Sequence, residues 1–475
     1  MPGNAMTMGG LPGHEAASEP HEANSLDGAG PNVEYCTMAF QGYMRRAVPA
    51  ADPELTQIGP GTPCGEYLRR IWQPVIMANR LEDLPVAVRM MGEDLVVFRD
   101  GSGAIGLLNR HCSHRGASLE YGVIRERGIS CCYHGWHYAC DGTVLDIPGE
   151  ASGSRIRDKV IHGAYPTREY RGVVFAYMGP PGTAPDFPIY DTYGLPGIEA
   201  VPFHLTIPCN WLQVYENTQD PVHVLHLHAQ ATGVQFAQSN AVRQLYDFMP
   251  TPLGMMNLQV RRMGGRAWVR TVECMLPNAN QTGAIWEEAE AEKVFQRVGI
   301  TRWVVPVDDT DTAILGWRWF GRDVDPRDQG DRAKVGFGSI DFMGQGEPRP
   351  YEEVQRQPGD YEAQVSQRPI AVHGLENLAS SDRGVAMLRQ LVRQGIRRLA
   401  REGRLDQPAT DDVIPTYTQD SVLPLPQGAG DDEAVLMAFG RALVAAMLED
   451  KSVGHAARAA RIRAVAADHV AGRQG

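Results

Sequence analysis

The chain has 475 residues, which is too long for one ordinary hydrophobic core and suits two domains. Its net charge of −12 argues against a nucleic-acid partner or an anionic membrane surface, because both are bound through clustered Lys and Arg. No run of about 18 apolar residues marks a membrane span, and eight cysteines are too sparse for a disulfide framework. We therefore expect a soluble protein.

The N-terminal part is predicted to begin as a tail and to continue as a β-rich domain. Residues 1–50 are rich in Gly, Ala and Glu and lack the basic start and apolar stretch of a secretory signal, so we expect a disordered or extended tail on a cytoplasmic protein. Residues 51–180 contain apolar stretches such as EDLVVFRDGSGAIGLLN, joined by Gly-rich turns, and predict a mainly β domain. The sequence GPPGTAPDFP marks its end.

The C-terminal part is predicted to mix helices with an antiparallel sheet. Residues 181–430 include alternating stretches such as GMMNLQVRRMGGRAWVRTVECML, whereas residues 322–370 are polar and are expected to form a long irregular excursion. The stretch SSDRGVAMLRQLVRQGIRRLAREG, residues 380–403, predicts an amphipathic helix with serines at its start and Gly at its end. Residues 431–475 predict a helical extension.

Cysteines and histidines concentrate in RHCSHRGASLEYGVIRERGISCCYHGWH, residues 110–137. The spacing is Cys112-x-His114, then sixteen residues, then Cys131-x2-His134. Two thiolates and two imidazoles suit either zinc or a 2Fe-2S centre in which histidines replace two cysteines on one iron. Spacing alone leaves both metals open, and it leaves Cys132 as an alternative to Cys131.

A second histidine group lies in NWLQVYENTQDPVHVLHLH, residues 210–228. Five residues turn an ideal helix by about 500°, which leaves His223 and His228 about 140° apart. A regular helix therefore favours His223 with His226 as a ligand pair.

Together the two segments resemble the Rieske non-haem iron aromatic ring-hydroxylating oxygenases, in their terminal oxygenase (alpha) subunit, and are closest to the phthalate dioxygenase-like and aromatic O-demethylase group. The first match is C-x-H, sixteen residues, then C-x2-H-G-W, and the second is E-N-x-x-D-x-x-H-x4-H. The first match also includes Arg115, Gly116, Tyr133, Gly135 and Trp136.

The resemblance implies which residues bind the two metal centres. Cys112 and Cys131 would bind one iron of a 2Fe-2S cluster, and His114 and His134 the other. His111, Cys132, His137 and Cys140 are then neighbours and not ligands.

For the mononuclear Fe(II), the resemblance implies His223 and His228, which requires a helix distorted between them. The third ligand is expected to be Asp382 of NLASSDRG, at the start of the amphipathic helix. Asp220 is expected to bridge an iron-bound histidine and a cluster histidine of a neighbouring subunit. That role implies a homo-oligomer, a trimer or a dimer of trimers.

The family also implies a fold and an activity. The fold would be α+β, with an all-β Rieske domain and a catalytic domain whose antiparallel sheet is flanked by helices in a helix-grip, START-like arrangement. The protein would use O2 as co-substrate to hydroxylate or O-demethylate an aromatic, carboxylated substrate. Ring cis-dihydroxylation, and a non-catalytic zinc or electron-transfer protein, are the alternatives.

Partners and substrate contacts complete the expectations. No Gly-rich dinucleotide motif follows a strand, so NAD(P)H is expected to act through a separate reductase, with or without a ferredoxin. An arginine in the pocket would pair with a substrate carboxylate, although solvated surface charges are an equally good interpretation of the arginines. The candidate substrate residues are Gln213, Asn217, Arg243, Arg261 and Arg262.

Overall fold

A computed structural model of the chain describes residues 47–151, 153–231, 233–321, 330–342, 344–346, 349–405, 413–428, 430–449 and 454–471. The predicted tail falls almost wholly outside the described residues. The described helices and strands belong to one unit that runs from Pro49 onward. The predicted boundaries at 180 and 430 within that unit stay a prediction.

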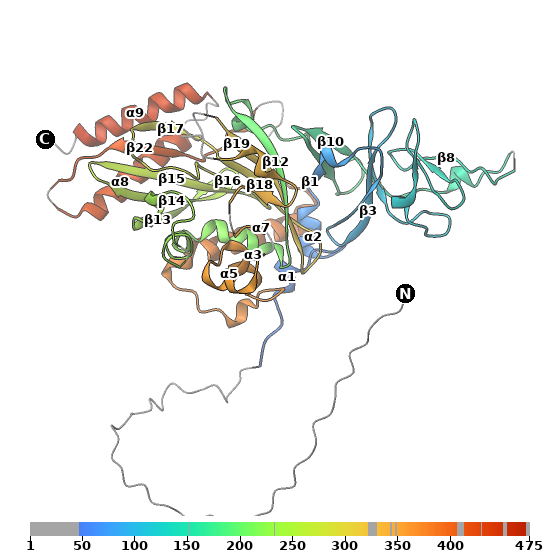
Figure 1. The fold of residues 1–475 in the computed structure, drawn as a ribbon, viewed down its shortest axis with the longest axis horizontal. Coiled ribbons are helices and arrows are strands. Elements are labelled where there is room, and N and C mark those ends of the chain that lie inside the picture. The colour runs from blue at the N-terminus through green and yellow to red at the C-terminus, as the bar shows by residue number, and fades with distance from the viewer. Residues whose placement is uncertain are drawn as a thin grey trace, which may run out of the picture. The chain divides into compact units, whose positions relative to one another are not determined.

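Short antiparallel strands form the N-terminal part of this unit (Figure 1). Three small sheets are present among the described residues of this part. The first has the order β1 (Trp72–Met77), β11 (Val173–Tyr177) and β10 (Thr167–Tyr170). The second has the order β2 (Val86–Met90), β3 (Glu93–Arg99), β4 (Ile105–Asn109) and β9 (Ala164–Tyr165). The third has the order β5 (Val123–Ile124), β6 (Ile129–Ser130), β7 (His137–Tyr138) and β8 (Val144–Asp146).

A nine-stranded antiparallel sheet forms the second part (Figure 1). Its main path runs β12 (Glu199–Ile207), β19 (Thr312–Phe320), β18 (Ile300–Pro306), β16 (Ala279–Thr282), β15 (Arg266–Met275), β14 (Gly254–Met263) and β13 (Gln244–Thr251). Beside it, β22 (Asp420–Pro424) pairs with β15 and with β17 (Lys293–Gln296).

The two faces of this sheet differ in chemistry because side chains alternate along each strand. On β14, Leu258 and Val260 pack with helices α8 (Asp432–Glu449) and α9 (His455–Ala471). On the opposite face, Asn257 donates a hydrogen bond of 2.7 Å to the carbonyl of Thr218, in the short helix η5 (Asn217–Gln219) that follows α3 (Trp211–Glu216). The C-terminal extension therefore covers one face, and the segment with the predicted iron ligands covers the other.

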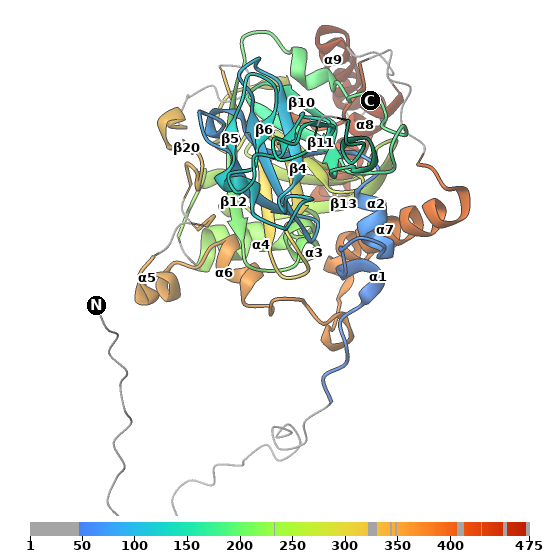
Figure 2. The same cartoon turned by 90° about the vertical axis from the view of Figure 1, so that its right-hand side faces the viewer.

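The predicted amphipathic helix is confirmed as α7 (Arg383–Glu402), which ends at Gly403 in the left-handed conformation that glycine adopts easily. Figure 2 shows α7 beside α1 (Pro53–Thr56) and α2 (Pro63–Leu68). Leu388, Val392 and Ile396 form its buried stripe. Helix α7 thus contacts both the start of the unit and the part that contains the nine-stranded sheet.

The polar excursion predicted at 322–370 is more ordered than expected over its described residues. It contains β20 (Val335–Gly336), β21 (Ser339–Ile340), α5 (Tyr351–Arg356) and α6 (Asp360–Val365). Elsewhere the α+β architecture agrees with the prediction, with an all-β N-terminal part and an antiparallel sheet flanked by helices. Across the described ranges, no helix has both the length and the apolar character needed to span a membrane.

Candidate metal centres

The segment with the predicted iron ligands is a broken helix. Asn210 caps α3 by accepting the Leu212 N–H at 3.2 Å, and η5 ends at Asp220, whose backbone leaves the helical region. Asp220 then accepts the Val222 N–H at 3.0 Å and starts α4 (Val222–Leu225). From His226 to Ala231 the chain continues as a π-helix, η6. The distortion expected between His223 and His228 is thereby confirmed, and the wide turn suits ligands five residues apart.

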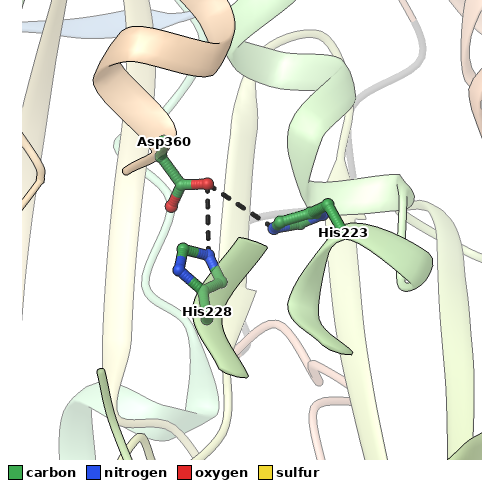
Figure 3. Close-up of side chains that lie close together, drawn as sticks. All are labelled: His223, His228 and Asp360. Carbon is green, nitrogen blue, oxygen red and sulfur yellow. Dashed lines mark ion pairs between the residues drawn. The ribbon is translucent and has the colours of Figure 1, made fainter. Parts of the chain in front are cut away.

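Asp360 joins the two histidines (Figure 3). Its Oδ1 lies 3.2 Å from Nε2 of His228 and 3.6 Å from Nε2 of His223. The two imidazole rings lie 5.2 Å apart between centroids, with an angle of 73° between their planes. Two imidazole nitrogens and one carboxylate therefore converge on one point, which is the donor set of non-haem Fe(II) enzymes.

Neighbouring side chains orient these three groups. Nδ1 of His228 hydrogen-bonds Oε1 of Gln235 at 2.6 Å, which leaves Nε2 free to bind a metal. Gln345 donates to Oδ2 of Asp360 at 2.8 Å, and Asn217 donates to Oδ1 at 3.1 Å. Nδ1 of His223 is held by the backbone carbonyl of Asp220. Each candidate ligand thus has a partner that fixes its orientation.

The charge on Asp360 suits metal binding. Burial by itself would raise its pKa, but the adjacent rings of His228 and His223 hold the pKa of this carboxyl well below its usual range. Asp360 is therefore an anion at neutral pH, as a metal ligand must be.

The prediction of Asp382 as third ligand is wrong in this structure. Its Oδ2 accepts the N–H of Ala379 at 2.6 Å in the capping box of the short helix η10 (Ser380–Asp382), and its side chain makes no cap hydrogen bond to α7. An aspartate at a helix start satisfies backbone donors, and this is what Asp382 does. Asp360 was missed because it lies at the start of a short helix inside the polar excursion, where neither spacing nor periodicity marks it. His226, the alternative histidine, is exposed and lies outside the group.

A cavity of about 110 Å³ opens beside the three groups. Besides them, polar lining residues include Asn217, Asp220, Asn240 and Gln259, together with two arginines, Arg270 and Arg302. The apolar wall consists of Val224, Phe236, Val272, Ile285, Ile300 and Phe342. The site can therefore hold a small, mainly apolar molecule next to a bound metal.

Of the predicted substrate residues, the structure brings only Asn217 to this cavity. Arg243 is exposed and pairs with Glu433 at 2.6 Å, and Arg262 pairs with Asp432 at the start of α8. Both point toward the face covered by the C-terminal helices, so the assignment of these two arginines to the pocket is corrected.

The other two candidates are buried structural groups. Arg261 is fully buried and donates to the side chain of Gln259 at 3.3 Å and to the backbone of Val242 at 3.3 Å. Gln213 bonds the backbone of residues 364, 368 and 371, so it ties the chain after α6 to α3. Neither side chain lines the cavity.

The cysteine–histidine segment forms two matching loops. The N–H of Gly116 bonds the carbonyl of Cys112 at 2.9 Å, and the N–H of Gly135 bonds that of Cys131 at 3.0 Å. Both glycines have positive φ, 75° and 73°, which a side chain would oppose. Each loop thus presents one cysteine and one histidine in the same way.

The ligands pair by type across these loops. Cys112 and Cys131 are buried, and their proximity contributes to a raised pKa of the Cys112 thiol, after burial as the largest cause. Sγ of Cys112 also lies 3.0 Å from the hydroxyl of Tyr138. His114 and His134 are exposed, with ring centroids 4.5 Å apart. The thiols form the inner end of the site, and the imidazoles form its outer end.

This arrangement does not suit one zinc ion. A tetrahedral zinc site brings its four ligand atoms within about 4 Å of one another. Within the described part of the chain, the only group of three or more such atoms within 4.8 Å of one another is His223, His228 and Asp360. Two separated pairs instead match a two-iron cluster with one pair on each iron.

The neighbouring residues make other contacts. Nδ1 of His111 lies 3.1 Å from the Gly116 carbonyl, and Nε2 of His137 lies 2.5 Å from the Arg127 carbonyl. Cys140 contacts Asp100 at 3.4 Å, and Cys132 is exposed.

Known proteins share both the sequence and the fold. The model of the Rieske [2Fe-2S] domain matches residues 71–166. The chain is 44% identical over 406 residues to the "Tert-butanol monooxygenase / tert-amyl alcohol desaturase oxygenase subunit" of Aquincola tertiaricarbonis, with 81% of this chain and 86% of that protein covered. It is 38% identical over 369 residues to "Phenoxybenzoate dioxygenase subunit alpha" of Ectopseudomonas oleovorans, with 73% and 84% covered.

A solved structure of dicamba monooxygenase bound to dicamba has the same fold, with a TM-score of 0.52 at 16% identity and coverage of 70% of this chain and 99% of that chain. The residues matched by the Rieske [2Fe-2S] domain include both cysteine–histidine loops. With relatives of this identity over most of their length, the chain belongs to the Rieske non-haem iron oxygenases, as an oxygenase subunit that uses one 2Fe-2S cluster, one mononuclear iron and O2.

Proposed function

We propose that His223, His228 and Asp360 hold the mononuclear iron of a terminal oxygenase that hydroxylates a compact substrate. The observation that supports this most directly is the convergence of the three side chains at the wall of a half-open cavity. Two histidines and one carboxylate leave coordination positions for O2 beside a bound substrate. The iron, when bound, supplies the activation of O2 by two electrons.

The surrounding residues would position the ligands and keep water out. Gln235 holds the His228 ring, and Gln345 and Asn217 hold the Asp360 carboxylate. The apolar wall would place a substrate C–H bond next to the metal and exclude bulk water, which limits unproductive consumption of reducing equivalents. These roles need no proton donor among the wall residues.

Cys112, Cys131, His114 and His134 are proposed to hold the cluster. Because the histidines are exposed at the outer end of the loops, a redox partner can approach them closely. The electrons would come from a separate NAD(P)H-dependent reductase, with or without a ferredoxin, and we place the system in the cytoplasm.

Asp220 supports the proposal of a head-to-tail homo-oligomer, a trimer or a dimer of trimers. Its side chain is 35% exposed, and its Oδ2 lies 3.8 Å from Nδ1 of His223. It lines both the iron cavity and a second cavity of about 460 Å³, which also includes Glu216 and Asp382. A cluster histidine of a neighbouring copy could dock in this opening and reach Asp220.

The substrate is proposed to be about the size of one ring. A closed cavity of about 150 Å³ holds benzene, and the present cavity of about 110 Å³ is smaller but half open, so a molecule of at most one ring fits it better than a biaryl. A single-ring aromatic substrate, hydroxylated or O-demethylated, is the first candidate. The relative with 44% identity is named for tert-butanol, and together with the small cavity this favours a branched tertiary alcohol as second candidate.

Purified protein with a surrogate reductase tests the proposal. We expect two iron atoms per chain in the cluster and one more at the mononuclear site, a rhombic EPR signal after reduction, and NADH-dependent O2 uptake. Benzoates, methoxybenzoates and tert-butanol form the substrate panel, with formaldehyde release reporting demethylation. Protein that contains the cluster but never binds the third iron would refute the assigned centre.

Co-expression tests the proposed oligomer. His223→Ala should lose the mononuclear iron, and Cys112→Ser should lose the cluster, so each variant alone should be inactive. Mixed oligomers should regain turnover if electrons pass from the cluster of one copy to the iron of the next. Inactive mixed oligomers that contain both centres would contradict transfer between copies.

A further inference from the structure

Arg270 is a buried cation at the wall of the iron cavity. It lies on β15, pairs across the sheet with Gln259 of β14 and Asp420 of β22, and is 7% exposed. Within the described residues, its guanidinium donates no hydrogen bond and forms no ion pair, and its buried Nε has no acceptor. A buried charge without an acceptor is costly, so this arrangement needs an explanation.

Three other buried arginines of this unit have acceptors for their guanidinium groups. Arg297 pairs with Asp191 at 2.9 Å, and Arg458 pairs with the same carboxylate at 3.2 Å. Arg261 lies next to Arg270 but bonds two glutamine side chains. Each of these three arginines therefore has at least one acceptor, whereas Arg270 has none among the described residues.

The nearest acid does not neutralise Arg270. Asp420 accepts a hydrogen bond from the indole of Trp268 at 2.5 Å and makes no ion pair with Arg270. Burial lowers the pKa of Arg270 while Asp420 raises it, so the acid acts on the guanidinium only from a distance. The guanidinium therefore remains available to a molecule in the cavity.

The second arginine of the cavity lies closer to the metal ligands. Arg302 of β18 donates to Asn280 at 3.2 Å, and burial lowers its pKa while nearby Asp360 raises it. Arg302 pairs across the sheet with Asn280 of β16, and Asn280 pairs with Cys274 of β15. Cys274 lies four residues after Arg270 on the same strand. Strand geometry then separates the two arginines by roughly 13 Å along the strands and about 10 Å across them. Arg270 thus lies on a distinct part of the cavity wall.

We propose that Arg270 binds a carboxylate of the substrate and thereby orients the substrate toward the iron. This inference rests on the proposed function, in which the cavity is the substrate site. A guanidinium binds a carboxylate through two parallel charge-assisted hydrogen bonds, which fix the direction of the bound acid. The substrate class is then a compact monocarboxylic acid, such as a branched aliphatic acid or a benzoate.

The test compares acids with uncharged molecules of the same shape. Binding of pivalate, pivalamide, benzoate, benzamide and tert-butanol to the iron-loaded protein is measured by calorimetry. Wild-type protein should bind each acid at least about tenfold more tightly than its amide, and pivalate more tightly than tert-butanol, since one charge-assisted pair is of this magnitude. Arg270→Gln should remove the preference for acids, and Arg270→Lys should keep part of it.

Arg243→Gln is the matched control, because Arg243 is an exposed arginine paired with Glu433, and it should retain the wild-type preference. Iron content and the cluster spectrum report folding of each variant. Wild-type protein that binds amide or tert-butanol as well as acid would overturn the substrate class, whether or not Arg270→Gln folds. An unchanged preference in iron-loaded Arg270→Gln would overturn the role of Arg270. Failure of the proposed function would show differently, as loss of the mononuclear iron or of O2 uptake in wild-type protein.

Discussion

Oδ1 of Asp360 lies 3.2 Å from Nε2 of His228, although the two residues belong to distant segments of the chain. Asp360 opens helix α6, and His228 lies in the π-helix. Gln213 of α3 holds the chain after α6 by accepting the N–H of Ala371 at 2.7 Å and donating to the carbonyl of Arg368 at 3.0 Å. The geometry of the metal site therefore depends on contacts between distant segments and not on local spacing.

Asp360→Asn should lose the mononuclear iron and keep the cluster. The amide is neutral and a weak ligand, so the two histidines alone would hold iron poorly. We expect iron to fall from three atoms per chain to two and NADH-dependent O2 uptake to be lost, with the reduced cluster retaining its EPR signal. Iron analysis and EPR of the same sample measure both.

Asp382→Asn is the matched control. The carbonyl oxygen of Asn can still accept the Ala379 N–H, so this variant should cost about 1 kcal/mol or less and should keep all the iron. If Asp382→Asn loses the mononuclear iron while Asp360→Asn retains it, the ligand assignment must be reversed.

The fold class could be predicted from local sequence patterns, whereas the choice of His228 over His226 came from the family resemblance, because regular helical geometry favours His226. Fixed spacing around Cys112 and Cys131 places both loops, and the alternation of apolar residues predicts the sheet. Once the resemblance selected His223 and His228, their spacing implied a helix that is distorted or ends between them, because it does not fit regular helical geometry. The structure resolves that conflict with a π-helix.

The third ligand and the pocket arginines could not be predicted, since both depend on long-range contacts. Arg261 and Arg270 are each one residue among several arginines on neighbouring strands, and only strand pairing decides which one reaches the cavity. Asp360 is one aspartate in a polar segment, whereas the sequence NLASSDRG around Asp382 resembles the segment that carries the third ligand in the family. In each case contacts between distant segments determine which side chain reaches the site.

Gln235→Leu should weaken iron binding without removing the ligands. Gln235 fixes the tautomer and direction of the His228 ring through a hydrogen bond of 2.6 Å. Loss of such a support costs about 10- to 100-fold in metal affinity. Iron titration of protein depleted of mononuclear iron measures the change. His226→Ala, an exposed position in the same π-helix, should leave the affinity unchanged, and an equal loss in both variants would show a general defect of the helix.

His204 should make the protein sensitive to acid. Burial, with a smaller effect of Arg80, lowers the pKa of His204 from 6.5 to about 4. Between pH 6.5 and about pH 4, His204 is therefore protonated in the unfolded chain and neutral in the folded chain. The stabilising contribution is complete above pH 6.5 and is lost as pH falls through about 4, and amounts to at most about 3 kcal/mol.

The comparison of wild type with His204→Gln tests this expectation. Glutamine does not titrate, so the thermal midpoint of the variant should decline less steeply from pH 6.5 to pH 4. Parallel curves for the two proteins would show that His204 does not contribute to acid sensitivity.

Arg458→Met should destabilise the protein even though Arg458 belongs to the C-terminal extension. The side chain is fully buried, lies 3.2 Å from Asp191 and donates to the carbonyl of Thr416 at 2.7 Å. Removing one partner of a buried ion pair costs about 3–5 kcal/mol, and we expect the lower end because Arg297 still pairs with Asp191.

Arg461→Met is the control on the same helix, since Arg461 forms an exposed pair with Glu449 and should contribute less than about 1 kcal/mol. Urea unfolding followed by circular dichroism measures both variants. Equal midpoints would mean that the buried contacts of Arg458 do not stabilise the protein, whereas a selective loss in Arg458→Met would show that they bind the extension to the rest of the unit.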